Sequence, residues 1–163
     1  MIFVTVGTHN QGFERLIKTI DELVGQRKLN EQVIIQTGNT DYVPKNCKWF
    51  KFTILQNFIK ICKKSNIIIT HSGVGSIIIP LQLKKPIIVV PRLKKFNEHI
   101  DDHQLQIAKE LDKQKKVIAV YDVNELLNAI KKARNFIPSK TVKKNKILNI
   151  IKKFLLGIEH EQN

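Results

Sequence analysis

The chain has 163 residues, of which 42% are hydrophobic, and this length and composition suit one domain with a buried core. No apolar run approaches the ~20 residues that a membrane-spanning helix needs. The N-terminal segment lacks the basic region of a signal peptide, so a cytoplasmic protein is expected. Cys47 and Cys62 have neither the spacing of a metal site nor the pattern of a disulfide framework.

The formal net charge of +14 predicts attraction to polyanions such as nucleic acid, anionic lipid headgroups or phosphorylated substrates. Arginine occurs only at positions 15, 27, 92 and 134, and the other basic side chains are lysine. Because base readout and bidentate phosphate binding favour arginine, this composition disfavours sequence-specific binding of nucleic acid. A lysine bias of genomic origin accounts for the charge equally well. No acidic residue occurs from 126 to 158, so this region is the expected contact with a negative partner.

Apolar runs of strand length alternate with segments of helical period along the chain. Strands are expected at 2–6, 32–37, 48–52, 66–70, 86–90 and 116–120, and helices at 12–24, 56–64, after 75, 98–112 and 122–134. Asn97 and Asp122 are the expected N-caps of the last two helices. The buried stripe of the helix at 98–112 is expected to contain Ile100, Ile107, Ala108 and Leu111. This order predicts the α/β class: a doubly wound, mostly parallel, Rossmann-like sheet with helices on both faces.

The segment "NFIPSK" at 135–140 is the one plausible joint in the sequence. It divides the chain into a Rossmann-like domain at 1–135 and a basic, amphipathic C-terminal helix and tail at 136–163. The apolar stripe of that helix comprises Ile147, Ile150, Ile151, Phe154 and Ile158. The stripe either packs on the helix's own domain or docks onto a partner or a membrane.

In folds of this class ligands bind outside the carboxyl ends of the strands, and three segments of the chain leave strands at that edge. The first is "GTHNQGFERL" at 7–16. Its glycines, Gly7 and Gly12, allow a tight turn, and the following helix offers free N–H groups that suit a diphosphate. The segment is also compatible with an ordinary turn in which Thr8 or Asn10 caps the helix. His9 is either an exposed loop residue or a proton-transfer group.

The second segment, "THSGVGS" at 70–76, follows the apolar run at 66–70. Gly73 and Gly75 let a ligand approach the backbone, while Ser72 or Ser76 can cap the next helix. His71 lies at the end of the expected strand, which makes it a second candidate for proton transfer.

The third segment, "RLKKFNEHIDDHQLQIAKEL" at 92–111, places His99 and His103 four residues apart, so that a helix would bring them to one face. Three interpretations are open: a metal site, a solvated helix start, or recognition of a hydroxyl-rich ligand. Zinc needs a third strong ligand and no cysteine is placed to supply it, so no metal is expected. Aspartate, histidine and glutamine together supply the paired donors and acceptors that a sugar requires.

In order and spacing, "FVTVGTH", "THSGVGS" and "PIIVVPRLKKFNEHIDDHQLQIAKEL" resemble the nucleotide-sugar-binding half of the GT-B glycosyltransferases of family 28. The resemblance covers roughly residues 1 to 130. It is strongest to the split members of the family. These are the small soluble subunit of the two-part UDP-GlcNAc transferase of N-glycan assembly and the small bacterial subunits of capsule and exopolysaccharide β-1,4-glycosyltransferases.

The resemblance assigns residues of this chain to the parts of a UDP-sugar. At the nucleotide and its diphosphate it implies Gly7, Thr8, Phe58, Ile59 (through its backbone), Ser72, Gly73 and Gly75. At the sugar it implies His103 and Gln104, with Glu98, His99, Asp101 and Asp102 beside them. Many members of the family hold the ribose with a glutamate seven residues before the proline of the next strand. This chain has Ile79 there.

The implied function is that of the UDP-sugar-binding subunit of a two-component, inverting glycosyltransferase, with β-1,4-galactosyl transfer as the first expectation. Its partner would be a membrane-anchored subunit that binds a polyprenyl-diphosphate-linked acceptor in capsule or exopolysaccharide synthesis, on the cytoplasmic face of an anionic membrane. No cofactor, metal or nucleic acid is expected, and His9 and His71 are the candidates for proton transfer. Two alternatives stay open: a non-catalytic enhancer of a membrane glycosyltransferase, and a basic α/β domain that binds polyanions such as nucleic acid.

Overall fold

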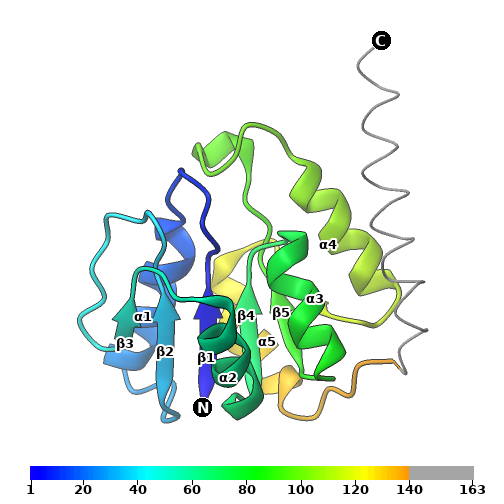
Figure 1. Ribbon diagram of the computed structural model, residues 1–163, viewed down its shortest axis with the longest axis horizontal. Coiled ribbons are helices and arrows are strands. Elements are labelled where there is room, and N and C mark those ends of the chain that lie inside the picture. Colours follow the sequence, from blue (N-terminus) through cyan, green and yellow to red (C-terminus); the bar gives the residue numbers. More distant parts are fainter. Residues whose placement is uncertain (140–163) are drawn as a thin grey trace.

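The computed structural model describes residues 1–139 and has one parallel sheet in the strand order β3-β2-β1-β4-β5-β6 (Figure 1). The strands are β1 (Ile2–Thr5), β2 (Val33–Gln36), β3 (Lys48–Phe50), β4 (Ile67–Thr70), β5 (Ile87–Val89) and β6 (Ile118–Ala119). Every pair of neighbouring strands is parallel, which confirms the expected fold class. The chain runs outward from β1 to β3 and returns to β4 on the other side of β1. Such a reversal between β1 and β4 is where doubly wound sheets bind ligands.

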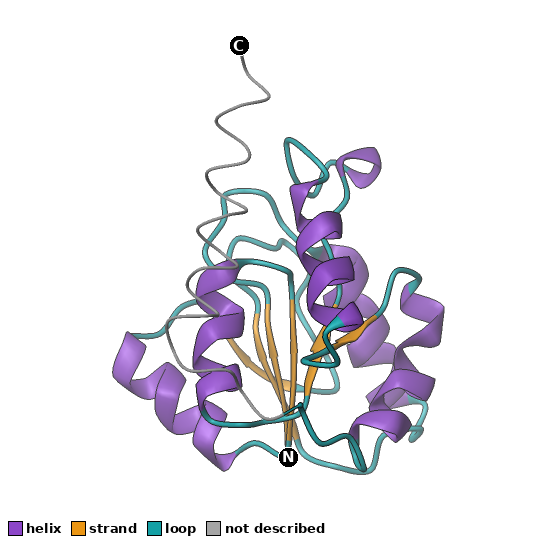
Figure 2. Ribbon diagram, turned by 90° about the vertical axis from the view of Figure 1, so that its right-hand side faces the viewer, coloured by secondary structure: helices purple, strands orange, loops and turns teal. Residues whose placement is uncertain are grey.

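Helices cover both faces of the sheet, and Figure 2 shows the strands between two layers of helices. The helices are α1 (Glu14–Gly25), α2 (Leu55–Lys64), α3 (Val74–Gln82), α4 (His103–Lys113) and α5 (Leu126–Ala133), with the short 3-10 helices η1 (Lys94–Phe96) and η2 (Val123–Glu125). On one face α1 and α5 pack against Val4 and Ile69. On the other face α2 and α3 pack against Phe3 and Ile68. Because both faces are covered there, the central strands β1, β4 and β5 are fully buried and mostly apolar, whereas the edge strand β3 is largely exposed.

The helix expected at 98–112 begins five residues late, at His103. Asn97 is not its N-cap, because this residue ends η1 in a left-handed conformation with a φ of 56°. Ile100, expected in the buried stripe, is 71% exposed, whereas Ala108 and Leu111 are buried as expected.

Acidic side chains keep this stretch out of the helix. The carboxylate of Glu98 accepts a hydrogen bond from the main-chain N–H at position 93 (3.1 Å), and that of Asp102 accepts one from position 94 (2.9 Å). Such local side-chain bonds offer the backbone an alternative to helical hydrogen bonds. His99 therefore lies outside α4 and does not share a helical face with His103.

Neither α1 nor α3 has the side-chain cap that its sequence suggested. Phe13 is the N-cap of α1, and its N–H donates to Thr40 Oγ1 at 2.9 Å, so neither Thr8 nor Asn10 caps this helix. Gly73 is the N-cap of α3, where no side chain makes a capping hydrogen bond. The carboxylate of Asp122 does accept a hydrogen bond, from the N–H of residue 124 at 2.9 Å, so it caps η2; α5 itself has Glu125 as its N-cap and no side-chain capping bond.

No helix within residues 1–139 is long and apolar enough to cross a membrane. The amphipathic C-terminal helix expected in 136–163 falls on residues from 140 onward, which lie outside the described part of the chain. That helix and the division of the chain after residue 135 stay predictions.

Candidate functional site

A cavity of about 680 Å³ opens at the carboxyl edge of the sheet, where loops after β1, β3 and β4 meet the start of α3. It brings together seven residues that the sequence singled out: Gly7, Thr8, His9, Phe58, His71, Gly73 and Gly75. It also includes Ile79, the position of the missing glutamate. The sequence did not single out as ligand contacts the other lining residues, which are Thr5, Asn10, Gln36, Thr53, Leu55 and Ser76. Their only signal was a position at the end of a strand, after a strand or at a helix start.

Two of the glycines are required by His71, which is 8% exposed. A Cβ on Gly7 would lie 2.5 Å from His71 Cε1, and a Cβ on Gly73 would collide with His71 Nε2. Gly7 also has a φ of +73°, a backbone conformation that residues other than glycine rarely adopt. Burial, and then the charge of Arg92, lower the pKa of His71 to about 3, so its ring is neutral at physiological pH.

Gly75 has a different surrounding from the other two glycines. A Cβ at this position meets no atom within 4 Å, and the residue lines the cavity. Gly75 is the second residue of α3. The first N–H groups of a helix have no intrahelical partner, and they carry the positive end of the helix dipole. The cavity therefore has backbone donors that suit an anion, and Gly75 places no side chain of its own beside them.

Two imidazoles flank Asp101, and a third, that of His9, lines the cavity beside them. The Nδ1 atoms of His99 and His103 lie 3.0 and 2.9 Å from oxygens of the Asp101 carboxylate. The His9 ring lies 5.0 Å from the His99 ring, centroid to centroid. Burial, and then the charges of His99 and Arg92, lower the pKa of His9. Within residues 1–139 no group of three or more His, Cys, Asp or Glu side chains is arranged to hold a metal ion.

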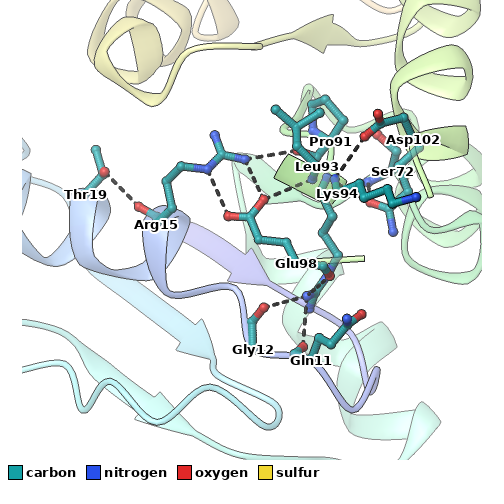
Figure 3. Close-up of polar contacts among 12 residues, drawn as sticks. Gln11, Gly12, Arg15, Thr19, Ser72, Pro91, Leu93, Lys94, Glu98 and Asp102 are labelled. Atoms are coloured by element: carbon teal, nitrogen blue, oxygen red, sulfur yellow. Dashed lines mark hydrogen bonds and ion pairs between the residues drawn. The ribbon is translucent and has the colours of Figure 1, made fainter. Parts of the chain in front are cut away.

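Glu98 and Gln104 are engaged with protein groups, and neither lines the cavity. The Glu98 carboxylate pairs with Arg15 at 2.8 and 2.9 Å (Figure 3). The side-chain oxygen of Gln104 accepts hydrogen bonds from the N–H groups of Ser72 (3.2 Å) and Arg92 (3.1 Å). Sugar binding by Glu98, His99, Asp102, His103 and Gln104 stays a prediction, as does uracil binding by Ile59.

Arg92 is a residue that sequence reasoning missed. Its side chain is 1% exposed, and its guanidinium donates to four main-chain carbonyls, those of Val6, Gln11, Gly12 and Glu98, at 2.7 to 3.0 Å. Burial lowers the pKa of Arg92 to about 10, while the Glu98 charge acts in the opposite direction. The available signal was chemical: in a chain that otherwise uses lysine, an arginine marks a site that needs several donors in fixed directions.

Comparison with known proteins gives this arrangement a family. The glycosyltransferase family 28 C-terminal domain matches residues 1–158. The UDP-N-acetylglucosamine transferase subunit ALG13 of Homo sapiens is 30% identical over 122 residues, which cover 69% of this chain and 10% of that protein. The corresponding protein of Candida albicans is 39% identical over 75 residues, covering 46% of this chain and 24% of that protein. The chain thus spans about a tenth to a quarter of the length of these curated relatives.

Solved structures show the same fold. An NMR solution structure of ALG13 superposes with a TM-score of 0.62 and 22% identity, covering 92% of this chain and 93% of that one. MurG of Acinetobacter baumannii gives a TM-score of 0.55 and 17% identity, covering 82% of this chain and 42% of that one. The parallel sheet, the pocket at its carboxyl edge and the match over residues 1–158 lead to one conclusion. The chain belongs to the glycosyltransferase family 28 C-terminal domain family.

Proposed function

We propose that the cavity binds the UDP part of a UDP-sugar, and that this chain is the donor-binding subunit of a two-component glycosyltransferase. The observation that carries the proposal is the start of α3, where Gly75 leaves backbone donors facing a cavity of about 680 Å³. Family membership supports glycosyl transfer, and the relatives named UDP-N-acetylglucosamine transferase subunits support a UDP-sugar donor.

The diphosphate is assigned to the space between the start of α3 and the loop that contains Gly7 and Thr8. Helix N–H groups and the helix dipole stabilise its charge without a metal. Uracil is assigned to the side of Phe58, whose ring packs edge-on against Phe3 at 5.6 Å, beside the backbone of Ile59. In place of the missing ribose glutamate, the hydroxyl of Ser76 is suited to bind the ribose, because it lies three residues before Ile79 on the same helical face.

The sugar is assigned to the end of the cavity near His9, where His99 and His103 flank Asp101. In the reaction an acceptor hydroxyl forms a bond to C1 of the hexose on the face opposite the nucleotide, so the configuration inverts. The bond between C1 and the diphosphate oxygen breaks at the same time, and UDP leaves with the electron pair. The hydroxyl proton passes to a base, for which His9 is the candidate on this chain, because it lines the cavity and its lowered pKa keeps the ring unprotonated.

The acceptor is assigned to a partner subunit. This chain spans only 42% of the MurG chain that shares its fold, and 34% of the glycosyltransferase of kitacinnamycin, so much of such a protein is not represented here. A membrane-anchored partner that presents a polyprenyl-diphosphate-linked sugar, in capsule or exopolysaccharide synthesis, completes the proposal. The net charge of +14 suits work at an anionic membrane. The proposed donor hexose is galactose, with N-acetylglucosamine, which the relatives' names contain, as the competitor.

Calorimetric titration with UDP, UDP-galactose and UDP-N-acetylglucosamine, in the presence of EDTA, tests the proposal. Saturable binding of UDP to the chain or to its complex with the partner is expected, and the two sugars are then ranked by affinity. Failure of UDP to bind in both preparations would overturn it.

A further inference from the structure

The side chain of Arg92 reaches two ligand-facing loops from inside the protein. Its Nη2 donates to the carbonyl of Val6, and its Nη1 to the carbonyls of Gln11 and Gly12, at 2.7 to 2.9 Å. Val6 precedes the loop at 7–12, which is assigned to the diphosphate, and Gln11 and Gly12 are its last two residues. Nη1 also donates to the carbonyl of Glu98 in the loop after β5. Figure 3 shows Gln11, Gly12 and Glu98 converging on this point.

The guanidinium of Arg92 hydrogen-bonds to main-chain carbonyls. Within residues 1–139 this guanidinium forms no ion pair, and the Glu98 carboxylate pairs with Arg15. The guanidinium carbon of Arg92, Cζ, lies over the Phe13 ring, 4.9 Å from the ring centroid. A buried cation is costly unless its donors are satisfied, and here three main-chain carbonyls accept from Nη1 and one from Nη2, while Nε has no partner within residues 1–139. Fixed donors on a planar group specify directions, which the flexible lysine side chain does not.

Peptide geometry connects these bonds to the cavity. In a trans peptide the N–H points opposite to the C=O. Because Arg92 holds the carbonyl of Val6, the N–H of Gly7 is directed away from Arg92 and donates to Thr5 Oγ1 at 3.4 Å; Thr5 and Gly7 both line the cavity. Thr8, His9 and Asn10 line it too, and within residues 1–139 their main-chain N–H groups donate to no other group.

Gln104 connects the third loop, the one after β4, to Arg92. Its side-chain oxygen accepts from the N–H of Arg92 and from the N–H of Ser72, which precedes α3. Gln104 is buried, with 7% of its surface exposed. The loops after β1, β4 and β5 are thus joined through one arginine and one glutamine.

We propose that Arg92 is a positioning residue of the donor site: its guanidinium sets the loop at 7–12 so that the loop's free N–H groups meet the diphosphate. The proposal rests on the function proposed above. It implies that Arg92 affects ligands through their phosphates, whereas binding of the uridine part, on the side of Phe58, is independent of it.

The test compares UDP with uridine, which has no phosphate. Affinities are measured by calorimetry for UDP and by NMR titration for uridine, on the chain or, where needed, on its complex with the partner. Arg92→Met should weaken UDP at least about tenfold and uridine less than about twofold. Arg92→Lys keeps the charge and part of the bonding and should show an intermediate loss for UDP; this variant carries the test if Arg92→Met fails to fold. Arg15→Met is the matched control, because Arg15 binds the loop after β5 but none of the carbonyls of 6–12.

The results separate the two proposals. A wild-type protein that binds no UDP contradicts the proposed function itself. If the wild type binds UDP, an Arg92→Lys variant with unchanged affinity for both ligands overturns the positioning role. Equal losses for UDP and uridine also overturn it, since a purely structural role weakens both. A change in the UDP-to-uridine ratio in Arg15→Met as large as in the Arg92 variants would do the same.

Discussion

Gly75→Ala separates the proposed ligand site from the fold. A Cβ at this position meets no atom within 4 Å, so the fold has room for the methyl group. Alanine is favoured over glycine in a helix by up to about 1 kcal/mol. We therefore expect a melting temperature that is unchanged or raised by up to ~4 °C.

The same methyl group projects into the cavity where the diphosphate is assigned. It keeps a phosphate from approaching the first N–H groups of α3. A hydrogen bond to a charged group contributes about 1.5–3 kcal/mol. Losing one such bond weakens the binding of UDP by about 10- to 150-fold.

Calorimetric titration with UDP and a thermal scan on the same preparations measure both effects. Gly73→Ala is the matched comparison, two residues earlier in the same segment. Its Cβ collides with His71, so this variant should lose stability, in contrast to Gly75→Ala. A folded Gly75→Ala variant with the UDP affinity of the wild type would refute the assignment of the diphosphate to the start of α3.

Three further predictions concern stability and sugar choice. Because the folded-state pKa of His71, about 3, lies below its ordinary 6.5, the unfolded chain binds more protons between these values. The free energy of unfolding should fall as pH drops below 6.5, by up to about 1.4 kcal/mol per pH unit; a His71→Asn variant with the same slope in urea titrations would contradict this. Asp21→Ala should cost about 3 kcal/mol, because the buried Asp21 carboxylate accepts hydrogen bonds from the Tyr42 hydroxyl and the N–H groups of residues 45 and 46; the control is Asp41→Ala, at an exposed site, and equal urea midpoints would refute the role. His103→Ala should change the relative affinity for the two UDP-hexoses about fivefold and leave that for UDP unchanged; an unchanged ranking removes His103 from the sugar site.

The central strands β1, β4 and β5 were predictable because burial on both faces gives each of them a mostly apolar run. The residues at which the strands end were harder to predict. The run at 86–90 includes Val90, which is fully buried, yet β5 ends at Val89. An apolar residue next to a strand fills the core whether or not it belongs to the strand. Hydrophobicity therefore locates the core more accurately than it locates the hydrogen-bonded residues of the sheet.

The start of α4 shows where local patterns were insufficient. Asn97 and the acids that follow it have the composition of a helix start. The structure uses Glu98 and Asp102 as acceptors for main-chain N–H groups at positions 93 and 94, and the helix begins only at His103. Whether an acidic side chain caps a helix or closes a loop depends on the backbone nearby, which composition does not specify.

The sequence by itself determined the α/β class and the three loops at the carboxyl edge, because periodicity and glycine positions are local properties of the chain. Tertiary structure alone decided what each group in those loops does. Gly73 makes room for His71, whereas Gly75 opens onto the cavity. Arg92 holds the carbonyl of Gln11 from 81 residues away. Contacts between such distant positions depend on how the strands are ordered in the sheet, and no local pattern of residues records that order.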